Sequence, residues 1–90
     1  MWQTLGNEGV KYRKTGSGAA VVLLHGFGED GHIWDDVADA LQSYTLLIPD
    51  LPGTGASAAA PLIDMDGMAG TVRRMLDQEG INQTAILGHS

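Results

Sequence analysis

The residues Gly88-His89-Ser90 have the types and the order that nucleophilic chemistry requires. They follow the short apolar run 84–87 and match the first three positions of G-x-S-x-G, in which a strained strand-to-helix turn exposes the serine hydroxyl. Gly-x-Ser alone is frequent in turns, so the prediction depends on its place directly after a buried strand. We therefore predict that Ser90 is a nucleophile. Consecutive side chains in a tight turn point apart, so we do not expect His89 to be its base.

A second stretch that could take part in a reaction is 25–28, His-Gly-Phe-Gly, which follows the apolar run 20–24. Glycines after a buried strand let the backbone turn sharply and approach a ligand closely. We predict that the backbone N–H of Phe27 donates to a developing oxyanion; the alternative is that the glycines only turn the chain. We assign His25 a structural role, because a side chain fixed on a tight turn cannot move between nucleophile and leaving group as a general base must. The residues predicted to border the substrate are Gly26, Phe27, Gly28 and His89.

A competing pattern overlaps this stretch. Residues 26–31 spell G-x-G-x-x-G between a predicted strand and a predicted helix, and Asp50 follows about 20 residues later, as in a dinucleotide-binding fingerprint. Two observations count against this interpretation. Glu29 and Asp30 would place carboxylates where a pyrophosphate needs positive potential, and Asp50 leads into a glycine-rich loop. We therefore favour nucleophilic chemistry over dinucleotide binding.

Length and composition limit the classes of function. The 90 residues form at most one small domain, and they contain no cysteine. The formal net charge of −6 argues against a nucleic-acid or anionic-membrane partner, because such surfaces require clustered Lys and Arg. No apolar run approaches the roughly 18 residues that span a bilayer. The N-terminus lacks the basic and apolar segments of a secretory signal, so we expect that such a signal is absent or was removed before this numbering begins. The absence of cysteine favours a cytoplasmic location.

The hydrophobic pattern predicts strands and helices that alternate along the chain. Asp64 is the predicted N-cap of the second helix and Gly80 the residue that ends it, while Gly67 and Gly70 indicate close packing or a later start. The long loop 51–63 has a length that is usually functional or mobile. The predicted elements are a hairpin over 2–14, a buried strand over 20–24, an amphipathic helix over 33–41, a buried strand over 44–48 that ends at Pro49-Asp50, a helix over 65–79 and a third buried strand over 84–87.

This alternation implies a parallel sheet with right-handed crossovers. The turns at Gly26 and Ser90 then lie at the same sheet edge, because both follow the carboxyl ends of parallel strands. If the two crossovers run in opposite directions, the helices cover opposite faces and strands 20–24 and 84–87 become neighbours. Neighbouring strands lie about 4.8 Å apart, so the two turns could address one small ligand.

Taken together, these features resemble the N-terminal part of the α/β-hydrolase superfamily, and the resemblance covers nearly the whole chain. It rests on the opening hairpin, His-Gly-x-Gly at 25–28, Trp34, Asp-x-Pro-Gly-x-Gly-x-Ser at 50–57 and the start of a nucleophile elbow at 88–90. Each motif is unspecific alone, but their order and spacing are specific together. The chain looks most like the small single-domain esterases and carbon–carbon bond hydrolases.

The resemblance implies an α/β fold with a mostly parallel sheet, an opening antiparallel hairpin and helices on both faces. Residues 1–90 would be the N-terminal part of one hydrolase domain of roughly 230 to 280 residues, truncated at the nucleophile elbow. Ser90 would attack a small ester, thioester or related carbonyl substrate and form an acyl-enzyme, Phe27 would supply one oxyanion-hole amide, and no cofactor or metal is implied. The triad acid and histidine would lie downstream, in the remainder of the domain.

Asp50 and Ser57 would belong to a structural loop in which Asp50 bonds nearby backbone amides and fixes the turn 52–55. Phe27, Glu29 and the loop 51–63 would border the substrate pocket. The strand 84–87 would be an apolar sheet edge, open to pairing with another chain. Two alternatives remain: a non-catalytic binding or subunit module that retains the fold, and acyl-transfer or cofactor-free haloperoxidase chemistry on the same fold.

Overall fold

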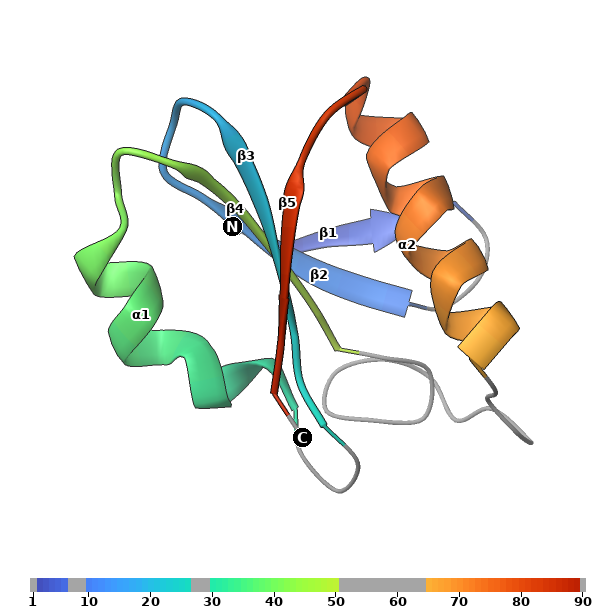
Figure 1. Ribbon diagram of the computed structural model, residues 1–90, viewed down its shortest axis with the longest axis horizontal. Helices are drawn as coiled ribbons and strands as arrows, with labels where there is room; N and C mark the ends of the chain where they lie inside the picture. Colours follow the sequence, from blue (N-terminus) through green and yellow to red (C-terminus); the bar gives the residue numbers. More distant parts are fainter. Residues whose placement is uncertain (1, 7–9, 27–29, 51–64, 90) are drawn as a thin grey trace.

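The computed structural model describes residues 2–6, 10–26, 30–50 and 65–89. At the centre is a five-stranded mixed sheet in the order β1-β2-β4-β3-β5 (Figure 1). β2 pairs antiparallel with both β1 and β4, whereas β3 pairs in parallel with β4 and β5. The pairing of β3 with β5 is the neighbour relation predicted for the first and third apolar strands. The elements are β1 Trp2–Leu5, β2 Val10–Thr15, β3 Ala20–Leu24, the 3-10 helix η1 Gly31–Trp34, α1 Asp35–Ala40, β4 Thr45–Asp50, α2 Met65–Glu79 and β5 Ala85–Gly88.

The two helical layers cover opposite faces of the sheet, which confirms the predicted architecture (Figure 1). Val72 and Met75 of α2 belong to one buried cluster, and Ala38 of α1 belongs to the other. Val22 and Leu23 are adjacent in β3 yet contribute to different clusters, because successive side chains of a strand point to opposite faces. Burial on both faces explains why β3 has a continuous apolar sequence rather than an alternating one.

A polar cluster attaches α2 to the opening hairpin. The Tyr12 hydroxyl donates to a carboxylate oxygen of Glu79 and accepts from Gln78 Nε2 at 2.9 Å, and Lys14 Nζ lies 2.8 Å from the other Glu79 oxygen. Burial, together with the Glu79 contact, raises the pKa of the Tyr12 hydroxyl to about 12. The Tyr12 side chain is fully buried, so this cluster holds the end of α2 against β2 in a water-poor setting.

The C-terminus of α2 has the geometry predicted from Gly80. Gly80 adopts a φ of 70°, its N–H donates to Asp77 at 3.1 Å, and the Ile81 N–H donates to Leu76 at 2.9 Å. These two bonds form a Schellman motif, in which a glycine with positive φ ends the helix and satisfies its last carbonyl groups. Since α2 begins at Met65, the later helix start indicated by the glycines at 67 and 70 is wrong. The predicted N-cap at 64 lies outside the described residues.

Two predicted boundaries are corrected. β4 does not end at Ile48 but continues through Pro49 to Asp50, with Pro49 opposite Tyr12 of β2. This is possible because the pairing of β4 with β3 stops at Leu47, so the missing N–H of proline disrupts no bond on that side. The first helix is also different from the prediction, since it begins as a 3-10 turn at Gly31 and ends at Ala40.

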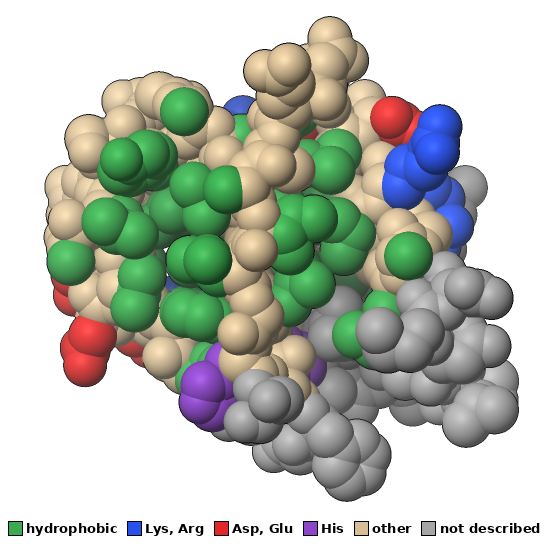
Figure 2. Space-filling view, in the orientation of Figure 1, with side chains coloured by type: hydrophobic (Ala, Val, Ile, Leu, Met, Phe, Trp, Pro, Cys, Tyr) green, Lys and Arg blue, Asp and Glu red, His purple; other side chains and the backbone are tan. Residues whose placement is uncertain are grey.

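β5 is an edge strand, and the prediction that it is buried is wrong. Each of its four residues is exposed, including Ile86 at 53% and Leu87 at 47%, because β5 is the last strand of the sheet and neither of these side chains belongs to a buried cluster of the described residues. Figure 2 shows hydrophobic side chains on both sides of this strand. The prediction of an apolar open edge is confirmed. Within the described part of the chain, no helix is long and apolar enough to cross a membrane.

Candidate active site

The carboxyl ends of β3 and β5 lie side by side. Leu24 is the register partner of Gly88, and the His89 N–H donates to the Leu24 carbonyl oxygen at 3.0 Å, one residue beyond the ladder. Gly26 and His89 therefore leave the sheet at the same edge, as the sequence predicted. The other candidates lie outside the described residues: Phe27, Gly28, Glu29, the loop 51–63 and Ser90.

His25 follows β3 directly and is buried, with 4% of its surface exposed. Its Nδ1 lies 2.9 Å from the Gly26 carbonyl oxygen, which is a geometry for donation from the ring to the backbone. Such a bond fixes the ring and the following peptide group relative to each other. This arrangement agrees with the structural role predicted for His25.

The imidazole of His89 packs against the indole of Trp34. Their ring centroids are 6.4 Å apart and the ring planes are inclined by 83°, which is an edge-to-face arrangement. Trp34 is the last residue of η1, so the contact joins the end of β5 to the helix that follows β3. The sequence pattern placed His89 at the site and Trp34 only within the family resemblance, and no local pattern indicated that the two rings touch.

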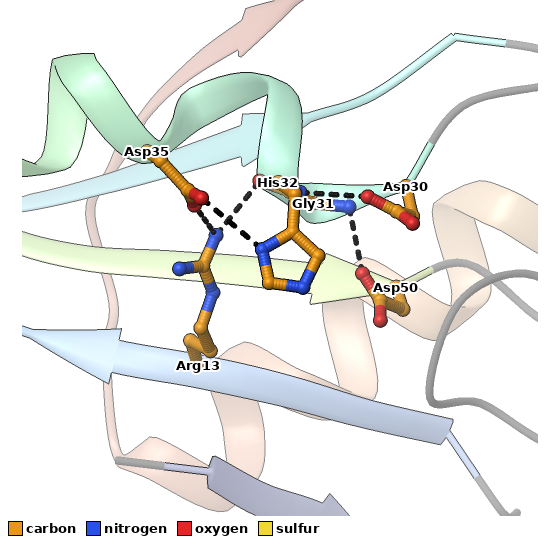
Figure 3. Close-up of polar contacts among 6 residues, drawn as sticks. All are labelled: Arg13, Asp30, Gly31, His32, Asp35 and Asp50. Carbon is orange, nitrogen blue, oxygen red and sulfur yellow. Dashed lines mark hydrogen bonds and ion pairs between the residues drawn. The ribbon is translucent and has the colours of Figure 1, made fainter.

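A second network fixes Gly31, the first residue of η1 (Figure 3). The Gly31 N–H donates to Asp50 Oδ1 at 2.7 Å, and Arg13 Nη2 donates to the Gly31 carbonyl oxygen at 2.8 Å. The same Arg13 nitrogen lies 2.8 Å from Asp35 Oδ1, and His32 Nδ1 lies 3.2 Å from the other Asp35 oxygen. The hydrogen bond from Arg13, followed by that from His32, lowers the pKa of Asp35.

Asp50 is 1% exposed, and its Oδ1 accepts the hydrogen bond from Gly31 inside the fold. A carboxyl group buried in this way is not presented to a ribose, which is the role that the dinucleotide fingerprint would assign to it. The structure therefore adds an argument against dinucleotide binding. The predicted bonds from Asp50 to the turn 52–55 lie outside the described residues; the described partner is Gly31, at the start of η1.

A groove of about 550 Å³ runs between α2 and β5. It is mainly apolar, and of the described candidate residues neither Gly26 nor His89 lines it. Among the described residues, no group of three or more His, Cys, Asp or Glu side chains is arranged to hold a metal ion. The residues that line the groove are Leu24, Met68, Ala69, Val72, Arg73, Leu76, Asp77, Ile81, Asn82 and Ile86.

Comparison with known proteins identifies the family. A family model described as alpha/beta hydrolase fold matches residues 19–90, and the chain therefore belongs to this family. Among solved structures, the epoxide hydrolase CorEH without ligand superposes with a TM-score of 0.91 at 30% identity, covering 100% of this chain and 32% of that one. A marine microorganism esterase superposes with a TM-score of 0.84 at 28% identity, covering 90% of this chain and 32% of that one.

Two curated proteins are similar in sequence. The 2-succinyl-6-hydroxy-2,4-cyclohexadiene-1-carboxylate synthase of Escherichia fergusonii is 39% identical over 70 residues, which are 78% of this chain and 28% of the synthase. The dihydrolipoyllysine-residue acetyltransferase component of the acetoin cleaving system of Cupriavidus necator is 41% identical over 87 residues, which are 90% of this chain and 22% of that protein. The chain thus spans less than a third of each relative.

Proposed function

We propose that this chain is the N-terminal part of a serine hydrolase that cleaves a small ester, thioester or related carbonyl compound. Ser90 is its nucleophile and the Phe27 N–H is one oxyanion donor. The observation that carries the proposal is the parallel pairing of β3 with β5, extended by the bond from His89 to Leu24. It brings the residues that precede Phe27 and Ser90 to one sheet edge, as attack on a carbonyl and stabilisation of the resulting oxyanion require.

The proposed reaction has two steps. The Ser90 oxygen attacks the substrate carbonyl carbon, its proton passes to a base, and the carbonyl oxygen becomes an oxyanion that accepts from the Phe27 N–H. The bond to the leaving alcohol or thiol then breaks, and the leaving group takes up that proton. In the second step water attacks the acyl-serine, releases the carboxylic acid and returns the hydroxyl to Ser90.

The base and the acid that orients it are supplied by the remainder of the hydrolase domain. In this family the triad acid and histidine follow the serine along the chain. The chain spans 28% of the synthase and 22% of the acetyltransferase component, so its relatives carry much sequence beyond the matched part. An unactivated serine is a poor nucleophile near neutral pH, so this remainder is an obligatory partner of residues 1–90.

Acyl transfer is a second candidate, because the acetyltransferase component matches 90% of this chain. In this proposed transfer the same acyl-serine forms, but a thiol or another nucleophile replaces water in the second step. The two functions are separated by supplying a thiol acceptor to the intact protein during ester turnover. Free acid as the main product supports hydrolysis, and acylated thiol supports transfer.

The test of the nucleophile is turnover of p-nitrophenyl acetate and butyrate by the intact protein that contains this chain. Ser90→Ala is expected to lower kcat by about a thousandfold or more, as loss of a catalytic serine does elsewhere. Ser17→Ala is the matched control, because Ser17 lies in an exposed turn and its described hydrogen bond comes from its backbone N–H. Full activity in Ser90→Ala would contradict the proposal and favour another nucleophile, whereas absence of turnover in the unmodified protein would favour a non-catalytic module.

A further inference from the structure

Resting on the proposed function, we propose that Asp50 and Arg13 are positioning residues that hold Gly31 in place and thereby aim the turn that begins at Gly26. Neither residue touches the proposed reacting atoms. They fix the backbone segment that carries the proposed oxyanion donor. Arg13 belongs to β2 and Asp50 to β4, and the turn connects neither of these strands. The role differs from the support of the turn 52–55 that the sequence suggested for Asp50.

Gly31 is held through both of its backbone polar groups. Asp50 Oδ1 accepts from its N–H at 2.7 Å, and Arg13 Nη2 donates to its carbonyl oxygen at 2.8 Å. Because the N–H and the carbonyl belong to different peptide groups, the two bonds together restrain both backbone dihedral angles of Gly31. Figure 3 shows the two side chains reaching Gly31 from β2 and from the end of β4.

The two anchoring residues are themselves fixed relative to each other. β2 and β4 are paired, with Lys11 opposite Asp50 and Arg13 opposite Ile48, so the two side chains leave neighbouring, rigidly paired backbones. Asp35 holds the same Arg13 nitrogen at 2.8 Å. The guanidinium therefore occupies a defined position and its bond to Gly31 is directional.

The space around Gly31 is narrow. A Cβ at this position would lie 2.9 Å from Asp50 Oδ1 and 3.0 Å from Ile48 Cγ2. The backbone thus approaches the end of β4 so closely that a methyl group here would require the Asp50 and Ile48 side chains to shift. This close approach explains why a glycine stands here without invoking a phosphate-binding loop.

The start of the turn is fixed at β3, since Leu24 is paired with Gly88 and His25 bonds the Gly26 carbonyl. Gly26 and Gly31, the described residues on either side of the proposed donor, are thus both restrained. A displacement of about 1 Å in a catalytic group can cost on the order of a hundredfold in rate. Loosening Gly31 should therefore lower kcat although no contact with substrate is removed.

The experiment measures kcat and KM in the intact protein for Asp50→Ala, Asp50→Asn and Arg13→Lys. Asp36→Ala is the control, because Asp36 is an exposed carboxylate on α1 outside this network. We expect Asp50→Ala to lower kcat about ten- to a hundredfold with KM changed less than about threefold. Asp50→Asn keeps an oxygen that can accept from Gly31 and should recover most of the rate. Arg13→Lys keeps the positive charge but loses the planar guanidinium group, and should lower kcat several-fold.

A second readout separates positioning from a purely structural role. Affinity for a boronic acid, which forms a tetrahedral adduct with a catalytic serine, should fall in parallel with kcat, while affinity for the product acid stays at the control value. A structural role would reduce the amount of folded protein and leave these constants unchanged in the folded fraction. Wild-type kcat in folded Asp50→Ala, or in Arg13→Lys if Asp50→Ala does not fold, would overturn the inference. Absence of Ser90-dependent turnover in the unmodified protein would instead overturn the proposed function.

Discussion

His89 donates its backbone N–H to the Leu24 carbonyl oxygen over 3.0 Å, one residue beyond the point where β5 and β3 are paired. This bond extends the parallel pairing into the two turns and fixes where each leaves the sheet. The Trp34 indole packs on the His89 ring from the side of η1. The candidate site is thus held by the ends of two strands and by the helix that follows the first of them.

Gly31→Ala is expected to destabilise the protein by about 1 to 3 kcal/mol, because the added methyl group would overlap Asp50 and Ile48. Urea unfolding measures the change. Gly70→Ala is the matched control: within the described part of the chain, its methyl group would meet the flexible end of Arg74, and alanine is favoured over glycine inside a helix by roughly 0.5 to 1 kcal/mol. We predict that the free energy of unfolding falls for Gly31→Ala and rises for Gly70→Ala, and equal changes would refute the steric argument.

Tyr12→Phe is expected to change how stability depends on pH at alkaline values. The Tyr12 pKa is raised from 10.0 to about 12, so the unfolded chain loses this proton first and stability falls as pH rises through that window. Below pH 10 the contribution of Tyr12 is fully present. The difference in free energy of unfolding between wild type and Tyr12→Phe should shrink between pH 10 and 12; a constant difference would contradict the assignment.

Gly80→Ala is expected to cost about 1 kcal/mol, because an alanine with a φ of 70° is strained. Among the described residues, no atom lies within 4 Å of the position that the added methyl group would take, so the predicted effect comes from backbone strain. Gly80→Asn should lose less, since asparagine tolerates the left-handed region better. Thermal unfolding of the wild type, Gly80→Ala and Gly80→Asn tests this order. A lower stability of Gly80→Asn than of Gly80→Ala would be inconsistent with it.

Ile86→Lys is expected to reduce self-association of the 90-residue polypeptide. Ile86 is 53% exposed on a strand with one unpaired edge, and a lysine on such an edge opposes pairing with another chain. Sedimentation velocity at several concentrations provides the measurement. Lys11→Glu, a charge change on β2 away from this edge, is the control; equal association of wild type and Ile86→Lys would show that β5 is not the contact.

The elements with a strong local pattern could be predicted from the sequence. The apolar run of β3 and the helical spacing of α2 defined those elements, and Gly80 marked the end of α2 because its conformation depends on local sequence. Pro49 misled the prediction, since whether a proline ends a strand depends on which neighbour is paired beside it. The exposure of β5 likewise depends on what packs on it, which a local pattern does not contain.

The candidate site was only partly predictable. The shared sheet edge of the turns after β3 and β5 was predicted because both turns follow the carboxyl ends of parallel strands, and Gly26 and His89 lie at that edge. The Gly31 network was not foreseen, because Arg13 and Asp50 lie 18 and 19 residues from Gly31 and come from opposite directions along the chain. In the sequence, Arg13 resembled any basic residue on the solvated face of a hairpin.

The most direct test of the proposed nucleophile is labelling of the intact protein with a fluorophosphonate probe, followed by intact mass and peptide mapping. Such a probe reacts with a serine only when a base activates it. The proposal predicts one adduct, on Ser90, in a species much heavier than the 9.5 kDa of this chain, and none in Ser90→Ala. An unlabelled Ser90 in the folded, intact protein, or an adduct that persists in Ser90→Ala, would contradict it.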